Sequence, residues 1–320
     1  MRHLFYINPI SKRVKGKAQQ IRDKLYTFFS GYPKIKYDIY ESRWCRDAFA
    51  YIRRYVSEHN ETIRVHAIGG TGTLFEVINS LIGFTNVEVA SHPYGKANSF
   101  LKYFGAKNEK LFLSLKSQVF DEAIPIDIIR CGNNYGICYG LVGIEAYANA
   151  MATRWVDLGL PGDVSYVVAG AVQILSGKTS QKYHIDIDEN TIKGDYASVM
   201  VANSPCYGLS MAPAIDAHPD DGLLEVYIFK NAPKLRLLTS IPAYTAGNYR
   251  DLPELVSHYT AKKVRLSSDE VMCMSIDGEP FYGTSIEYQI MPKAIRFVCP
   301  GELDRSKLPR LYGKPREGLR

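Results

Sequence analysis

The sequence predicts an α/β plus β protein with two domains, an N-terminal doubly wound parallel sheet and a C-terminal antiparallel β-sandwich. The chain has 320 residues, which is long for a single compact core. Strands alternate with helices up to about residue 122, which is typical of a parallel sheet. After residue 123 strands and turns follow one another, as they do in antiparallel sheets.

The first domain is predicted from apolar runs that alternate with segments of helical spacing. Strands are expected at 3–9, 34–42, 63–70 and 87–95, and helices at 16–32, 46–60 and 73–83. The carboxyl ends of parallel strands meet at one edge of a sheet, so we expect the ligand loops there.

The second domain is predicted from hairpins. They turn around Gly132 to Asn134 and around Glu189 and Asn190, further strands are expected within 262–281, and one helical stretch is expected at about 163–175. The expected domains are 1–123 and 124–302, with the last strand able to return to the first domain. Residues 303–320 form a basic tail that we expect to be flexible.

Composition favours a cytoplasmic protein. The sequence has no apolar run of eighteen residues, and its first nine residues are typical of a strand. The six cysteines are scattered without a CxxC pair, which indicates reduced thiols. The net charge of +6 is concentrated in 11–17, 234–238 and the tail, which suits phosphates or an anionic membrane surface; solvated basic faces are the alternative. We expect no nucleic-acid partner, and the sequence leaves open whether the protein forms a homodimer.

A glycine-rich turn, Gly69 to Thr73, joins a predicted strand to a predicted helix. Glycines permit positive φ and let a ligand approach the backbone, and the helix N-terminus attracts negative charge. The turn therefore suits a phosphate, although a tight structural turn would also explain the glycines.

Two other strand ends carry polar side chains. Asn8 and Ser11 follow the first strand and precede several basic residues, and Lys96 and Asn98 follow a later one. Three polar loops at one edge of a parallel sheet predict a nucleotide pocket.

The second half contains two acidic turns. "HPDDGLL" (218–224) offers carboxylate and carbonyl oxygens, which suit Mg²⁺, and Glu279 in "SIDGEPF" could accept a proton from a substrate hydroxyl. Ordinary Asp-Gly turns are the alternative for both. The apolar stretch 139–175, which includes Trp155, is either a core helix with its packing strand or, if it opens, an acyl-chain site.

Five motifs carry a resemblance to a known family. "NPIS", "GGTGTLFEVIN", "PYGKANSF", "APAIDAHPDDGLLEVYIF" and "IDGEPF" stand in the order and at the spacing found in the soluble diacylglycerol kinase and sphingosine kinase family of lipid kinases, which the chain resembles over residues 1–300. The resemblance implies phosphoryl transfer from ATP to a lipid hydroxyl, such as that of diacylglycerol. It also implies a nucleotide cleft between the two domains and a peripheral position at a membrane surface.

The resemblance assigns roles by matching motifs. Glu279 matches the proton acceptor, with Asp277 beside it, and Asp221 with the carbonyls of His218 and Leu223 matches a magnesium site. The residues matched to nucleotide binding are Asn8, Ser11, Lys12, Ser42, Gly69, Gly70, Thr71, Gly72, Thr73, Lys96 and Asn98.

The chain departs from the family pattern around the expected phosphates. Thr71 and Ser99 stand where the family has aspartates, and Lys12 and Lys96 replace uncharged residues. A hydroxyl is a weak Mg²⁺ ligand and no general base at neutral pH. Three outcomes stay open: an active lipid kinase in which Glu279 is the base and Lys96 stabilises the phosphate, a degenerate kinase fold that binds nucleotide or phospholipid without turnover, and a kinase for another substrate or donor.

Overall fold

The chain folds into two compact units. The computed structural model describes residues 1–10, 12–44, 46–95, 98–160, 162–206 and 211–303. Unit 1 contains residues 1–126 and 293–303, and unit 2 contains residues 127–292. The predicted α/β plus β class is confirmed. The predicted boundary at residues 123 and 124 falls at the start of a strand. The tail predicted to be flexible follows Leu303 and lies outside the described residues. The predicted cleft between the domains stays a prediction.

Unit 1 is built on a parallel sheet. Its own strands are β1 (Arg2–Ile7), β2 (Lys36–Glu41), β3 (Ile63–Gly69) and β4 (Val87–Pro93). They follow the order β4-β3-β1-β2, and the last residues of β13 (Glu279–Val298) pair in parallel with β4. The helices are α1 (Lys12–Lys15), α2 (Ala18–Ser30), α3 (Asp47–Ser57), α4 (Thr71–Leu81) and α5 (Leu115–Phe120), with 3-10 segments at Ser99–Phe104 and Ala106–Leu113.

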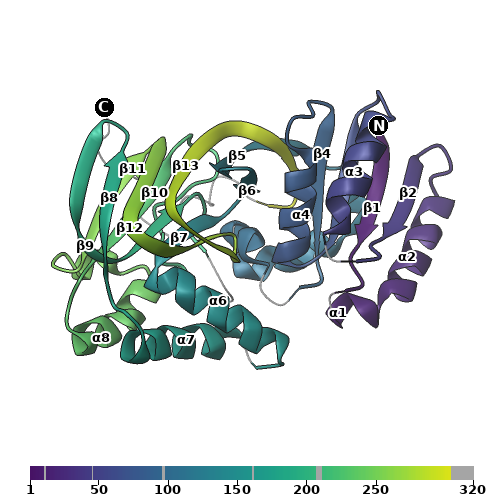
Figure 1. Cartoon of the computed structure of the whole chain (residues 1–320). Helices are drawn as coiled ribbons and strands as arrows, with labels where there is room; N and C mark the ends of the chain where they lie inside the picture. Colours follow the sequence, from purple (N-terminus) through teal and green to yellow (C-terminus); the bar gives the residue numbers. More distant parts are fainter. Residues whose placement is uncertain (11, 45, 96–97, 161, 207–210, 304–320) are drawn as a thin grey trace. The chain divides into compact units, whose positions relative to one another are not determined.

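Helices cover both faces of this sheet, as a doubly wound fold requires. The buried face of α2 recurs every three or four residues, as in Ile21 and Leu25, and packs with α5 on the face of Phe5 and Ile7. On the opposite face the Tyr6 hydroxyl reaches Glu76 of α4. Figure 1 shows α3 and α4 side by side on that face.

Unit 2 is dominated by antiparallel strands. They are β5 (Ala123–Cys131), β6 (Asn134–Gly136), β7 (Tyr139–Gly143), β8 (Gln181–Ile187), β9 (Asn190–Ala202), β10 (Leu224–Lys230), β11 (Val256–Ala261), β12 (Lys263–Ile276) and most of β13. The main sheet runs β11-β10-β9-β7-β12-β13, and β8 pairs with both β9 and β12. Both predicted hairpins are present, since β5 pairs with β6 and β8 with β9.

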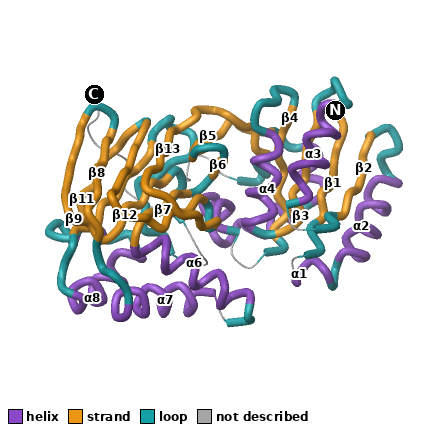
Figure 2. The backbone as a smooth tube through the Cα atoms, viewed as in Figure 1, coloured by secondary structure: helices purple, strands orange, loops and turns teal. Residues whose placement is uncertain are grey.

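The described residues of unit 2 also contain three helices, α6 (Ile144–Asp157), α7 (Gly162–Ser176) and α8 (Lys234–Thr245), and a short 3-10 turn at Tyr249–Asp251. The three helices lie side by side along one side of the antiparallel strands (Figures 1 and 2). The predicted helix at 163–175 is α7. The pattern predicted no separate helix at α6, and it missed α8, which contains Pro242 and starts directly after Pro233. Among the described helices, none is both long and apolar enough to cross a bilayer.

Candidate functional site

The glycine turn of unit 1 is formed by close backbone packing. Gly70 caps α4, and a Cβ on Gly95 would lie 2.2 Å from the Gly70 Cα. A Cβ on Gly69 would lie 2.1 Å from the Thr73 Oγ1, whereas a Cβ on Gly72 meets nothing within 4 Å. Packing therefore explains Gly69, Gly70 and Gly95, and the open space beside Gly72 is what a ligand approaching the helix N-terminus requires.

Three of the predicted nucleotide residues meet at the carboxyl edge of the sheet. The Asn8 side-chain amide after β1 donates to the Thr73 Oγ1 at 3.2 Å, and the Ser42 hydroxyl after β2 donates to the Asn8 Oδ1 at 3.3 Å. The Ile10 amide donates to the same Asn8 oxygen at 3.2 Å. Asn8 therefore links the loops after the first two strands to the start of α4.

Thr71 ties the glycine turn to the loop after β4. Its Oγ1 accepts a hydrogen bond from the Ser99 amide at 3.3 Å. In the same loop the Asn98 side-chain amide donates to the Gly95 carbonyl and to Glu109. The Thr71 hydroxyl therefore helps to hold a loop in place. Of the other predicted nucleotide residues, Ser11, Lys96 and the side chain of Lys12 lie outside the described residues.

The "IDGE" segment of unit 2 is a two-residue hairpin turn. Asp277 and Gly278 both have positive φ, 47° and 94°, which is the type I′ geometry that Asp-Gly favours. Glu279 pairs with Ile276 across the turn and begins β13 half-buried.

Asp277 differs from Glu279 in its surroundings. It is 7% exposed, and its carboxylate accepts hydrogen bonds from the amides of Ile137, Cys138 and Tyr139 at 2.6, 2.9 and 3.0 Å. Burial raises the pKa of this carboxyl to about 6, against the three amide bonds, which lower it. Asp277 thus anchors the turn on a neighbouring segment of backbone, and Glu279 is the better candidate for proton transfer.

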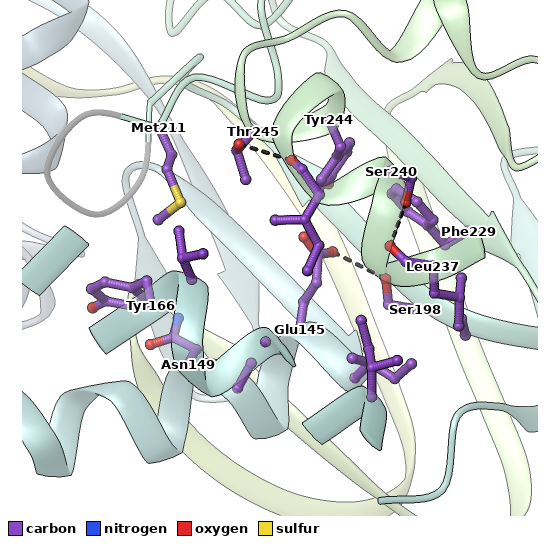
Figure 3. Close-up of a pocket in the computed structure, with 17 residues that line it drawn as sticks. Glu145, Asn149, Tyr166, Ser198, Met211, Phe229, Leu237, Ser240, Tyr244 and Thr245 are labelled. Carbon is purple, nitrogen blue, oxygen red and sulfur yellow. Dashed lines mark hydrogen bonds between the residues drawn. The ribbon is translucent and has the colours of Figure 1, made fainter. Parts of the chain in front are cut away.

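An apolar pocket lies within unit 2, and one of its lining residues, Asn149, lies near this turn. Figure 3 shows residues from α6, α7 and α8 that surround it. Its polar lining includes Glu145, which accepts a hydrogen bond from the Ser198 hydroxyl at 3.1 Å (Figure 3). The remaining lining includes Ile144, Ala148, Tyr166, Val167, Ile174, Met211, Phe229, Leu237, Ile241 and Tyr244.

One end of the pocket adjoins the turn that carries Glu279. Asn149 lines the pocket, and its side-chain amide donates to the Tyr139 hydroxyl at 3.2 Å. The Asn149 Oδ1 and the Tyr139 hydroxyl each lie 3.9 Å from the position of a Cβ on Gly278. Residues 139–175 were predicted to be either core packing or an acyl-chain site. The structure is compatible with both, because α6 and α7 pack on each other and also form pocket walls.

The acidic turn before β10 contacts a buried carboxylate that the sequence pattern did not reveal. The Gly222 amide donates to Asp127 Oδ2 at 2.7 Å, and the Asp127 amide donates to the Pro219 carbonyl at 2.7 Å. Asp127 is fully buried on β5. A lone aspartate in an apolar strand was the available signal. Asp221 lies exposed on the turn and accepts a hydrogen bond from the Leu223 amide at 3.0 Å.

The acidic turn offers oxygen atoms of the kind that Mg²⁺ prefers. One buried acceptor near it, Asn203 Oδ1, has no hydrogen-bond partner in the described part of the chain. The Asn203 side-chain amide donates to the Asp127 carbonyl, which places this residue near the strand that holds the turn. The described residues contain no group of three or more His, Cys, Asp and Glu side chains that could bind a metal. The magnesium site predicted from Asp221 and the carbonyls of His218 and Leu223 therefore stays a prediction.

Comparison with known proteins gives a consistent match over both units. The diacylglycerol kinase catalytic domain matches residues 2–131, and the YegS C-terminal NAD kinase beta sandwich-like domain matches residues 140–299. Relatives from Staphylococcus aureus strains JH9 and N315, each named "Putative lipid kinase", are 28% identical over 239 residues, which is 74% of this chain and 77% of theirs.

Solved structures show the same fold. Two structures titled as putative diacylglycerol kinases from Bacillus anthracis have TM-scores of 0.72 and 0.69, at 18% and 19% identity. They cover 94% of this chain, and 96% and 98% of those chains. The chain is thus a two-domain protein of the diacylglycerol kinase-like class. It belongs to the diacylglycerol kinase and YegS family of lipid kinases.

Proposed function

We propose that this protein is an ATP-dependent lipid kinase that transfers a phosphoryl group to a lipid hydroxyl, such as that of diacylglycerol. The observation that carries the proposal is the apolar pocket whose Asn149 end adjoins the Asp277–Gly278 turn. An acyl chain in this pocket would leave its polar end near Glu279. An apolar lining suits a hydrocarbon chain, so the same observation supports a lipid as the substrate class.

Unit 1 supplies the groups proposed to bind the nucleotide. The amides at the start of α4 and the polar network of Asn8, Ser42 and Thr73 lie at one edge of its sheet. A helix N-terminus beside an open glycine position suits the phosphates of ATP. In the sequence, the departures from the family pattern add two lysines, Lys12 and Lys96, to the loops matched to nucleotide binding.

Glu279 is proposed as the proton acceptor. The lipid hydroxyl oxygen attacks the γ-phosphorus of ATP, a new O–P bond forms, and the bond between that phosphorus and the β–γ bridging oxygen breaks. The hydroxyl proton passes to the Glu279 carboxylate, and ADP leaves. Asp277 fixes the turn from which Glu279 projects. When bound, Mg²⁺ supplies positive charge, and Asp221 with the carbonyls of His218 and Leu223 would hold it.

The substrate is proposed to enter from a membrane surface. Val164, Val167 and Val168 are exposed apolar residues of α7, and Leu158 and Leu160 are exposed just before it. Val167 also lines the pocket, so the exposed apolar surface is continuous with the proposed acyl-chain site. An exposed apolar helix face of this kind suits shallow insertion into a lipid interface, which supports a peripheral position at the membrane.

A second candidate is a catalytically degenerate kinase fold that binds a nucleotide or phospholipid without turnover. The observation that favours it is the environment of Thr71, where a hydroxyl bonded to the Ser99 amide replaces the carboxylate of the family pattern. Without that carboxylate, phosphate and metal binding would depend on other groups. This candidate predicts ligand affinity without phosphoryl transfer.

The test combines binding and transfer. Calorimetry with ATP, with and without Mg²⁺, measures nucleotide binding, and a labelled-phosphate assay on mixed vesicles that contain diacylglycerol measures transfer. Binding with transfer supports the lipid kinase. Binding without transfer to any lipid hydroxyl tested supports the degenerate fold, and absence of ATP binding would contradict the proposed nucleotide role of unit 1.

A further inference from the structure

A series of buried hydrogen bonds links the two acidic turns of unit 2. At one end Asp127 holds the turn that contains Asp221, through the Gly222 amide. At the other end Asp277 holds the turn that carries Glu279, through three consecutive amides. Asn203, which directly follows β9, links the two turns in this series of hydrogen bonds and is fully buried.

Asn203 uses its donors on both sides. Its Nδ2 donates to the Asp127 carbonyl at 3.0 Å and to the Ile137 carbonyl at 2.9 Å. Its backbone amide donates to the Cys138 carbonyl at 2.8 Å. One side chain therefore bridges β5 to the segment between β6 and β7.

The peptide groups between Asn203 and Asp277 make this bridge stiff. The Ile137 carbonyl and the Cys138 amide belong to one planar peptide group. The Asn203 side chain donates to this carbonyl, and the amide donates to Asp277. The two hydrogen bonds therefore fix the same plane. The next plane is held by backbone bonds alone, because the Cys138 carbonyl accepts from the amides of Asn203 and Ser204 and the Tyr139 amide donates to Asp277. A substitution of the Asn203 side chain leaves these bonds in place.

We propose that Asn203 is a positioning residue whose side chain couples the Asp221 turn to the Glu279 turn by orienting the peptide plane between Ile137 and Cys138. The proposal rests on the proposed function in one respect: it assumes that Glu279 and Asp221 serve the same phosphoryl transfer. Asn203 does not touch substrate in this assignment; it determines where Asp277, and with it the Glu279 turn, is anchored.

The test compares Asn203→Ala with Ser204→Ala. Ser204 follows Asn203, is equally buried, and its hydroxyl makes no hydrogen bond in the described part of the chain, so its removal leaves the bridge intact. For Asn203→Ala we expect a fall in kcat of about a hundredfold, because small misplacements of reacting groups cost about that much, with the KM for ATP unchanged. We also expect the Mg²⁺ concentration for half-maximal rate to rise about tenfold, whereas Ser204→Ala changes neither.

Hydrogen exchange provides a readout that does not depend on catalysis. In Asn203→Ala the amides of Cys138 and Gly222 should exchange at least tenfold faster than in Ser204→Ala, as measured by NMR or by mass spectrometry of short peptides. If wild type transfers no phosphate, the proposed function fails, while exchange still decides whether the two turns are coupled.

Two results would overturn the inference: a folded Asn203→Ala protein with kcat within twofold of Ser204→Ala, or unchanged exchange at Gly222 when Cys138 exchanges faster. If Asn203→Ala does not fold, Asn203→Ser takes its place, because one short hydroxyl cannot bridge both carbonyls. The same exchange pattern is then expected, and unchanged exchange contradicts the coupling.

Discussion

The glycine turn of unit 1 and the Asp277 turn of unit 2 are stabilised in opposite ways. At the glycine turn two backbones touch, since a Cβ on Gly95 would come within 2.2 Å of the Gly70 Cα. At the Asp277 turn a buried carboxylate holds three amides. The first turn depends on the absence of side chains and tolerates a change of charge at position 71. The second depends on the hydrogen bonds that a buried carboxyl group accepts, although burial disfavours its negative charge. The comparison explains how the family's glycines persist here while its loop aspartate is replaced.

The largest effect is expected at Glu279. Replacing it by glutamine removes the proposed proton acceptor at constant size, so transfer to lipid should fall by about a thousandfold, within the range for general-base loss, while ATP affinity is retained. A labelled-phosphate assay and calorimetry measure the two quantities. Glu287→Gln, on the same strand near Arg130, is the matched control and should keep its activity. Residual activity above one tenth would exclude Glu279 as the base.

The second effect concerns the pH dependence of stability. The folded pKa of Asp277, about 6, exceeds the value near 3.8 of an unperturbed aspartate. The folded state therefore binds more protons between these values, and the contribution of Asp277 to the free energy of unfolding falls as pH rises from about 4 to 6, by about 3 kcal/mol. Above pH 6 the contribution is constant.

The variant Asp277→Asn isolates the pH-dependent contribution of Asp277, because it removes the titrating carboxyl and leaves every other carboxyl in place. Urea unfolding of both proteins from pH 4 to 7 should give a difference in unfolding free energy that changes across this window and then levels off. A difference that is constant with pH would contradict the raised pKa.

The third effect concerns the contact between Gly95 and Gly70. Gly95→Ala should lower the free energy of unfolding by about 1 to 3 kcal/mol, because a methyl group cannot fit without moving the backbone. ATP affinity should fall with it. Gly72→Ala is the control: its Cβ meets open space in the first turn of a helix, so stability should stay constant or rise by up to about 1 kcal/mol. Equal losses in both variants would show that packing does not distinguish these glycines.

The smallest effect is expected at Thr71. Thr71→Asp restores the carboxylate of the family pattern, and we expect Mg²⁺-dependent transfer to rise by up to about tenfold, as one added charge near the phosphates can provide. Thr71→Ala controls for loss of the hydrogen bond from the Ser99 amide and should cost about 1 kcal/mol of stability. If Thr71→Asp leaves activity unchanged, position 71 does not limit the reaction.

The sequence by itself determined the class of fold and the turns. Strand and helix periods differ, so the alternation in residues 1–122 and the hairpins after residue 123 were readable locally, as was the Asp277–Gly278 turn, whose residues favour positive φ. The glycines at 69, 70 and 95 were visible as turn residues, although nothing local showed that two of them touch.

Tertiary structure alone decided which side chains meet. Asp127 and Asn203 are 76 positions apart, and Asp277 lies 140 positions from Ile137, so no pattern of neighbours could pair them. The pocket combines α6, α7 and α8. Of these, α7 was predicted as a helix of its own, α6 was not separated from it, and the prolines at the start of α8 and inside it obscure the helical pattern. Local propensities act over a few residues, whereas the satisfaction of buried polar groups depends on contacts that exist only once the strands have paired.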